Sequence, residues 1–190
     1  MRISTTQYAA YKARNSTASK AAKAKRTTKA KKVVSFALSA HAKALAKLFK
    51  DPSLGVGKQE HFSQVSLFDF FHDNHEDIYD LFYAIPNSGK RHIKVATEMK
   101  AEGQKSGYPD MGLDAARGIY HGFRCELKTE VGTAQPNQVE YAEKLRKQGY
   151  CVVFCYGFDA AVTAILEYWN LSINGVMSKH VYKPEKISKK

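Results

Sequence analysis

The sequence lacks any apolar run long enough to span a membrane. No stretch of about 18 apolar residues occurs in the 190-residue chain, and a membrane-spanning helix needs about that length. The first residues are polar and do not form the apolar core of a secretory signal. From these absences we expect a cytoplasmic protein that does not contact a membrane.

Cysteine is also scarce. The chain has three cysteines, Cys125, Cys151 and Cys155, and no CxxC pair. An odd number without that spacing argues against a disulfide framework and against a zinc knuckle. All three lie in apolar stretches, so we expect buried, reduced thiols.

Acidic residues are almost absent from the N-terminal part. Residues 1–58 hold 14 Lys and Arg but one acid, Asp51, whereas residues 59–190 hold 16 Lys and Arg against 17 acids. The net charge of +12 therefore belongs to the N-terminal part. A basic segment attached to a nearly neutral domain is attracted to polyanions, so we expect a nucleic acid as its partner.

The charge and the apolar pattern together predict three regions. Residues 1–32 are rich in Ala, Lys, Ser and Thr and hold too few large apolar groups to form a core. Residues 33–50 carry apolar groups at helical spacing and predict a helix, so 1–58 is interpreted as a basic N-terminal extension. Residues 59–175 form the predicted globular domain, and 176–190 form a C-terminal tail.

The globular region predicts an α/β fold in which helices flank a mixed β-sheet. The predicted order is α-β-α-β-β-α-β-α, which is typical of such folds. Helices are predicted at 60–77, 88–108, 136–148 and 158–170, and strands at 78–87, 109–116, 122–129 and 150–157. The second and third strands are expected to form a hairpin.

Charged residues occur within this hairpin. Asp110 opens its first strand, Glu126 lies in its second strand, and Lys128 follows two residues later. Side chains alternate along a strand, so Glu126 and Lys128 share one face, and pairing across the turn can bring Asp110 beside them. We expect this cluster to face solvent at a sheet edge. Two carboxylates suit Mg²⁺ or Mn²⁺, and a lysine can orient an attacking water; the other interpretation is a surface salt-bridge cluster.

These residues carry a resemblance to a known family. "YPD" followed sixteen residues later by "ELK" resembles the PD-(D/E)XK nuclease signature. Five segments resemble the VRR-NUC family in their order and spacing: Ile85–Arg91, Lys100–Met111, Gly122–Lys128, Gln135–Tyr150 and Gly157–Trp169. The resemblance covers residues 60–169 and leaves the basic extension outside.

The family contains metal-dependent nucleases, found alone in phages and as a C-terminal module of repair nucleases. Similarity to the stand-alone phage type implies a restriction-endonuclease-like core and a bacterial or phage-infected host cell. It also implies that Asp110, Glu126 and the Leu127 carbonyl would bind Mg²⁺ or Mn²⁺, with Lys128 as the catalytic lysine. Glu60, from the first helix of the domain, would reach the metal directly or through water.

Two glutamines and a set of DNA contacts complete the predicted site. The resemblance implies that Gln64 and Gln138 lie beside the metal, with Gln138 among the catalytic residues. The expected DNA contacts are Gln64, Lys90, Arg91, Tyr120 and His121, the last two as exposed residues at the hairpin tip.

Ordinary structural roles remain open for several of these residues. Glu60 can be a solvated acid in the first turn of a helix, and Gln138 can be an ordinary surface residue. Lys90 and Arg91 can form a solvated turn. The stretch "HDNHED", residues 72–77, is interpreted as the polar end of a helix rather than a second metal site.

Together these features predict a Mg²⁺- or Mn²⁺-dependent endodeoxyribonuclease, expected to act on branched, flap or junction DNA. Stand-alone members of the family tend to be dimeric, so we expect a homodimer. The alternative is a non-catalytic DNA-binding protein on a nuclease scaffold. The combination of Asp110, Glu126 and Lys128 favours the enzyme, because a decayed site usually has lost at least one such residue.

Overall fold

A four-stranded mixed sheet forms the centre of the molecule. The computed structural model describes residues 38–86 and 93–178. The strands are β1 (Phe82–Ala84), β2 (Met111–Leu113), β3 (Phe123–Lys128) and β4 (Cys151–Tyr156), in the order β1-β2-β3-β4. β1 pairs antiparallel with β2, β2 antiparallel with β3, and β3 parallel with β4. The predicted mixed sheet and its hairpin are confirmed.

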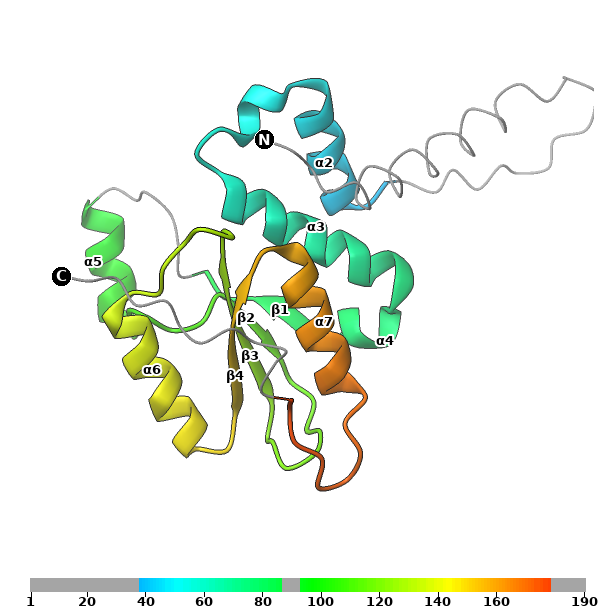
Figure 1. Cartoon of the computed structure of the whole chain (residues 1–190). Coiled ribbons are helices and arrows are strands. Elements are labelled where there is room, and N and C mark those ends of the chain that lie inside the picture. The colour runs from blue at the N-terminus through cyan, green and yellow to red at the C-terminus, as the bar shows by residue number, and fades with distance from the viewer. Residues whose placement is uncertain (1–37, 87–92, 179–190) are drawn as a thin grey trace, which may run out of the picture.

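Helices cover both faces of this sheet (Figure 1). They are α2 (Ala40–Lys50), α3 (Gln59–Asn74), α4 (Glu76–Tyr79), α5 (Ile93–Ala101), α6 (Pro136–Lys147) and α7 (Phe158–Trp169), with a 3₁₀ turn η1 at Pro52–Gly55. The main core lies between the sheet and α3 and α7, and a second cluster lies between β4 and α6. The predicted α/β architecture is therefore confirmed.

The alternation of side chains along β3 divides the sheet into an apolar and a polar side. Cys125 and Leu127 belong to the core under α3 and α7. Arg124, Glu126 and Lys128 therefore point to the opposite face, on the side of α6. On the neighbouring β4, that face carries the apolar residues packed against α6. The polar side chains of β3 therefore lie beside apolar side chains of β4.

The expectation that Glu126 and Lys128 face solvent at a sheet edge is wrong. β3 lies between β2 and β4 in the middle of the sheet. Glu126 is 1% exposed and Lys128 is 8% exposed. The physical reason is the crossover through α6, because it adds β4 in parallel along the far side of β3 and brings α6 over its polar face.

Several predicted boundaries shift in the structure. The helix predicted over 33–50 begins at Ala40, where the Ser39 hydroxyl accepts a hydrogen bond from the Ala42 amide at 2.9 Å; residues 33–37 lie outside the described ranges. The short helix α4 was not predicted. At the other end, Met177 is buried, so the packed body extends to the last described residues. The division into domains at residues 58 and 175 stays a prediction.

The cysteines agree with the expectation from the sequence. Cys125, Cys151 and Cys155 are buried and free, as expected. Across the two described ranges, no helix combines the length and apolar character that crossing a bilayer requires.

Candidate active site

The site is built around a buried ion pair on β3. The Lys128 ammonium Nζ lies 2.6 Å from the carboxylate oxygen Oε1 of Glu126. The two residues share a face of the strand because they are two positions apart. A buried carboxylate is unfavourable unless it is paired and hydrogen-bonded, so this arrangement needs the further partners described next.

Gln138 supplies one of these partners from the first turn of α6. Its side-chain amide Nε2 donates to the same Glu126 oxygen that pairs with Lys128. Its own carbonyl Oε1 accepts the backbone amide of Gln135 at 2.8 Å, which fixes the side chain at the helix start. Gln138 is therefore a half-buried residue of the site and not an ordinary surface residue.

Asp110 is the residue just before β2, and it also joins the cluster. Met111 pairs with Cys125, so Asp110 lies opposite Glu126. Its Oδ2 accepts the backbone amide of Leu127 at 3.1 Å. The amide and carbonyl of a strand residue point to the same side, so the Leu127 carbonyl also faces Asp110. These contacts bring the two predicted carboxylates and the predicted carbonyl together.

The approach to Asp110 is shaped by a glycine turn. Gly107 has a φ of +81°, and a side chain there would collide with the backbone carbonyl of Asn137 at the start of α6. Glycine therefore lets the segment before Asp110 pass close to α6. The backbone carbonyl of Asp110 also accepts the Ile85 amide at 2.7 Å. Asp110 is thus held between α6, β1 and β3.

Glu60 reaches the same end of β3 from the first turn of α3. Its Oε1 accepts the backbone amide of Thr129, the residue after Lys128, at 3.4 Å. This contact places the helical carboxylate beside the end of the strand, although Glu60 as a whole is exposed. Gln64 lies one helical turn further along α3 and is half-buried.

The electrostatics of the cluster are dominated by negative charge. Burial, together with the charges of Asp110 and Glu60, raises the pKa of Glu126 to about 7, against the opposing effect of Lys128. Burial alone would lower the pKa of Lys128, but the Glu126 carboxylate and its neighbours outweigh it, and that pKa lies above its usual value. The charges of Glu126, Asp110 and Glu60 thus all act on this one ammonium, and their excess negative charge favours an added cation.

The oxygen donors fit a hard divalent cation. No group of three or more His, Cys, Asp and Glu side chains in the described part of the chain could hold a metal. Asp110 and Glu126 supply two carboxylates, and the Leu127 carbonyl is a third oxygen that such a group does not include. Mg²⁺ is usually bound by one or two carboxylates, with waters and substrate phosphate completing its shell. The donor set is therefore sufficient for Mg²⁺ or Mn²⁺.

The predicted DNA contacts at the hairpin lie away from this cluster. β3 runs from Phe123, next to the hairpin turn, to Lys128 at the site, so Tyr120 and His121 lie at the other end of the strand. Tyr120 is half-buried, with its ring 6.2 Å from that of Tyr168, and our expectation that it is exposed is wrong. The reason is the segment after α7, whose Met177 amide donates to the Tyr120 hydroxyl at 3.3 Å.

The other predicted contacts fall into separate places. His121 is exposed, and its Nδ1 lies 2.9 Å from the carbonyl oxygen of Gln148. Lys90 and Arg91 lie outside the described residues. The stretch 72–77 spans the end of α3 and the start of α4, where His72 Nδ1 lies 2.6 Å from Asp73 Oδ1.

The structure adds one charged residue that the sequence analysis did not single out. Arg124 is 5% exposed and lies on the same face of β3 as Glu126. Its Nη1 donates to Asp114 at 3.1 Å, and its Nε donates to the Tyr108 hydroxyl at 3.3 Å. Arg124 therefore links the segments before and after β2. The alternating Arg-x-Glu-x-Lys pattern of β3 was the signal that could have identified it.

Aromatic rings flank this arginine. The guanidinium lies 4.7 Å from the ring centroid of Tyr150 and 5.9 Å from that of Tyr83. Tyr83 also donates from its hydroxyl to Asp114 at 3.0 Å. The arginine is thus held by cation–π and hydrogen-bond contacts on several sides.

A comparison with solved structures shows a protein that is similar to this chain. A solved structure described as a VRR_NUC domain protein shares 32% sequence identity with this chain, at a TM-score of 0.53. The match covers 60% of this chain and 90% of that protein. A scan against protein-family models and a search of curated proteins found no match.

Proposed function

Because this chain belongs to the VRR-NUC family, a family of nuclease domains, we propose that it is a Mg²⁺- or Mn²⁺-dependent endonuclease that hydrolyses phosphodiester bonds in DNA. One observation carries the proposal. Glu126 and Lys128 are buried as an ion pair in the central strand, and Asp110 and Glu60 converge on the same strand end. Such a cluster is costly for stability, and a catalytic role explains its presence.

The metal would be held by the carboxylates of Asp110 and Glu126 and by the Leu127 carbonyl. Glu60 would reach it directly or through a water. When bound, a divalent metal lowers the pKa of a coordinated water and offsets negative charge on the phosphate. Because Glu126 is buried, few water molecules can reach its carboxylate and compete with the metal for it.

The remaining residues position these ligands and the substrate. Lys128 holds its ammonium 2.6 Å from Glu126, where it would orient the attacking water and offset charge that develops on the phosphate. Gln138 donates to the same carboxylate and would fix its orientation, as the outer partners of metal ligands commonly do. Both residues act from rigid elements, β3 and α6.

For the substrate we propose branched, flap or junction DNA, cut by a homodimer. The family resemblance supports this choice, and the basic extension supports DNA as the partner because 14 Lys and Arg lie in residues 1–58.

A panel of labelled duplex, flap, single-stranded and four-way-junction DNA, incubated with Mg²⁺ or Mn²⁺, tests the function. We expect internal cleavage that is strongest on a branched substrate and absent in EDTA. Binding without cleavage of any substrate in either metal would instead support a non-catalytic DNA-binding protein. Equal rates on duplex and branched DNA would overturn the substrate preference while leaving the nuclease proposal intact.

A further inference from the structure

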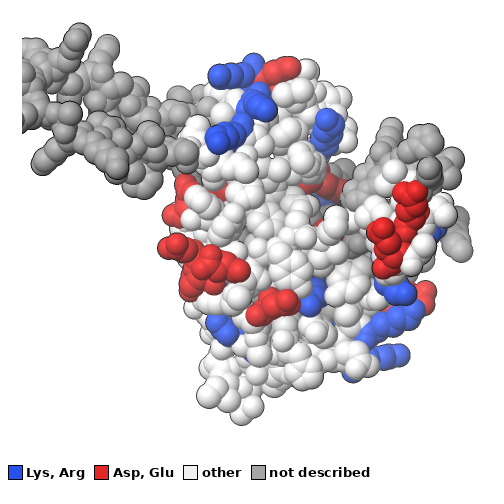
Figure 2. All heavy atoms as spheres, turned by 180° about the vertical axis from the view of Figure 1, so that it is seen from behind, with Lys and Arg blue, Asp and Glu red and all other residues white. Residues whose placement is uncertain are grey.

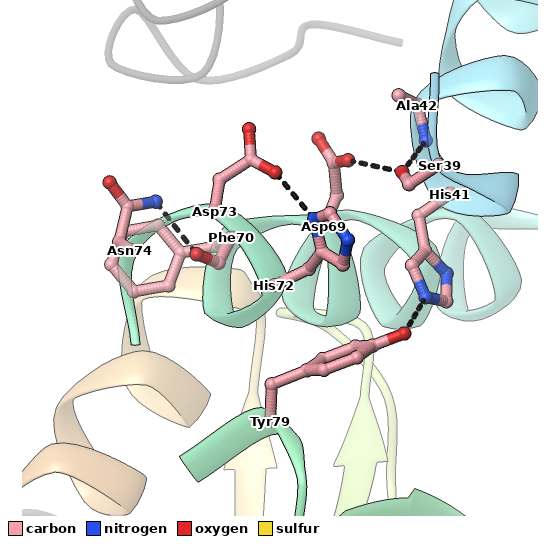
Figure 3. Close-up of polar contacts among 9 residues, drawn as sticks. All are labelled: Ser39, His41, Ala42, Asp69, Phe70, His72, Asp73, Asn74 and Tyr79. Atoms are coloured by element: carbon pink, nitrogen blue, oxygen red, sulfur yellow. Dashed lines mark hydrogen bonds and ion pairs between the residues drawn. The ribbon is translucent and has the colours of Figure 1, made fainter. Parts of the chain in front are cut away.

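The helix α2 is fixed to the nuclease core by specific contacts (Figure 3). The Ser39 hydroxyl, which caps α2, donates to the buried Asp69 carboxylate at 3.4 Å. His41 Nε2 lies 3.0 Å from the Tyr79 hydroxyl, and the His41 ring stacks on Phe68 with centroids 5.6 Å apart. The first turn of α2 is therefore anchored to the second half of α3 and to α4.

These contacts define the direction of α2. Its start lies beside Asp69, late in α3, and its end leads through η1 to Gln59, where α3 begins. The chain therefore returns from the end of α2 to the start of α3, and Figure 1 shows α2 crossing α3 at a steep angle. Glu60, in the first turn of α3, contacts Thr129 at the site. The end of α2 is thus joined through η1 to the helix that carries Glu60.

One face of α2 is basic. Lys43, Lys47 and Lys50 are exposed and lie at positions i, i+4 and i+7, which fall on the same side of a helix. The helix contains no acid, and none of the ion pairs among the described residues involves these lysines. We refer to these three lysines as the α2 basic face.

The acidic groups of this region lie elsewhere. Asp73, Glu76, Asp77 and Asp80 are exposed at the end of α3 and around α4. Figure 2 shows basic side chains gathered at the end of the molecule formed by α2 and acidic ones at the side of α4. A polyanion is therefore attracted to α2 and repelled from α4.

The helix dipole alone does not explain the α2 basic face. Lys47 and Lys50 lie in the last turn, where positive charge complements the helix C-terminus. Lys43 lies a full turn earlier and gains little from that effect. The three lysines extend over about 10 Å at 1.5 Å per residue, which matches about three base pairs at 3.4 Å each.

We propose that the α2 basic face binds the phosphate backbone of the duplex DNA that the site cleaves. This proposal rests on the proposed function and adds the surface that holds the substrate. Phosphate contacts of this kind set the position and orientation of the duplex and carry no sequence information. α2 is docked on α3, so this surface has a set geometry with respect to Glu60.

The test measures duplex DNA binding by the full-length chain in EDTA, as a function of salt, by fluorescence anisotropy. The triple variant Lys43→Gln, Lys47→Gln, Lys50→Gln should lower the magnitude of the salt slope by about 2.7, at about 0.9 per phosphate contact. The matching Lys→Arg triple should keep the wild-type slope. The control Lys144→Gln, Lys147→Gln, on the exposed side of α6, should change it by less than about one.

Each outcome decides the proposal. An unchanged slope in the Gln triple, an equal loss per charge in the α6 control, or a loss seen on duplex RNA but not on duplex DNA would overturn it. If the triple variant melts early by circular dichroism, Lys43→Gln alone, outside the last turn, should lower the slope by about 0.9, and no change would overturn the proposal. Binding in EDTA needs no cleavage, so a failed nuclease assay leaves this result interpretable.

Discussion

At the scale of single residues, Arg124 makes contacts that its sequence pattern does not reveal. It joins Tyr108, two residues before Asp110, to Asp114, just after β2. We expect it to be a positioning residue that sets where Asp110 lies relative to Glu126. This role differs from catalysis because the guanidinium donates to Tyr108, Asp114 and the Phe123 carbonyl rather than to a predicted metal ligand.

In the variant Arg124→Met, the Mn²⁺ concentration that gives half-maximal cleavage should rise several-fold. Losing the hydrogen bonds of the buried guanidinium should also cost about 1.5–3 kcal/mol of unfolding free energy. Arg124→Lys should restore part of the metal affinity. Cleavage rates across a Mn²⁺ titration measure the first effect, and chemical denaturation measures the second.

Arg117→Met is the matched control for this prediction. The Arg117 guanidinium lies 3.9 Å from the Trp169 ring centroid and donates to the Trp169 carbonyl at 3.1 Å. These contacts lie at the hairpin end of the sheet, opposite to the end that carries the site. The variant Arg117→Met should lose unfolding free energy but should need the same Mn²⁺ concentration for half-maximal cleavage as the wild type. An unchanged Mn²⁺ titration in Arg124→Met would show that Arg124 is only structural.

The residue-level site could be predicted in part. The alternation of β3 and the hairpin register bring Glu126, Lys128 and Asp110 together, and both follow from local sequence. Their burial could not be predicted, because it depends on β4 and α6 packing beside β3. The contacts of Arg124 could not be predicted either, since its partners come from both ends of another strand.

At the scale of elements, α2 depends on a histidine for its attachment. Burial lowers the pKa of His41, with Asp69 opposing this effect and His72 adding to it. The folded-state pKa therefore lies below the usual 6.5, so the neutral form is favoured on folding. The stabilisation is present above about pH 6.5 and is lost as the pH falls through the lower, folded-state pKa.

We therefore expect α2 to detach more readily in mild acid. Hydrogen exchange of α2 amides, corrected for intrinsic rates, should be faster at pH 5 than at pH 7, relative to amides of α7. The variant His41→Phe keeps the ring but cannot titrate, and it should remove this pH dependence. Equal protection of α2 at both pH values in the wild type would contradict the prediction.

Elements with strong periodicity were predictable, and those defined by distant contacts were not. α3, α6, α7 and the strands followed from apolar spacing and from breakers such as Gly149. α4 has four residues, too few to show a helical period. The half-burial of Tyr120 depends on residues after α7 folding back over it, a contact 57 positions apart in sequence.

At the scale of the whole molecule, the N-terminal arm should add affinity without selecting the cut. Residues 1–32 contain ten Lys and Arg and no acid. If six to eight of these contact phosphates, the arm contributes a salt slope of about −5 to −7. Deleting residues 1–32 should weaken binding and flatten its salt dependence, with turnover at saturating DNA nearly intact.

Anisotropy titrations at several salt concentrations measure the arm's contribution, and mapping of product ends measures the cut position. An equal affinity and an equal salt slope for truncated and full-length chains would contradict this prediction. A shifted cut position would show that the arm guides the substrate rather than only attracting it.

The assembly expected for two-strand cleavage is a homodimer with two sites related by a two-fold axis. Light scattering at micromolar concentration should return about twice the chain mass of 21.3 kDa. A mass that stays near 21.3 kDa across that range would count against the dimer.

We propose that Asp110, Glu126 and Lys128 form a metal-dependent nuclease site. The most direct measurement is the cleavage rate of Glu126→Gln on the preferred DNA at saturating Mn²⁺, beside Glu140→Gln, which alters an exposed carboxylate of α6. We expect Glu126→Gln to lose at least about 10²–10³ in rate while it stays folded, because Gln has the same shape and removes a buried charge. Glu140→Gln should cleave like the wild type. Wild-type rates in Glu126→Gln, or wild-type cleavage that persists in EDTA, would contradict the account.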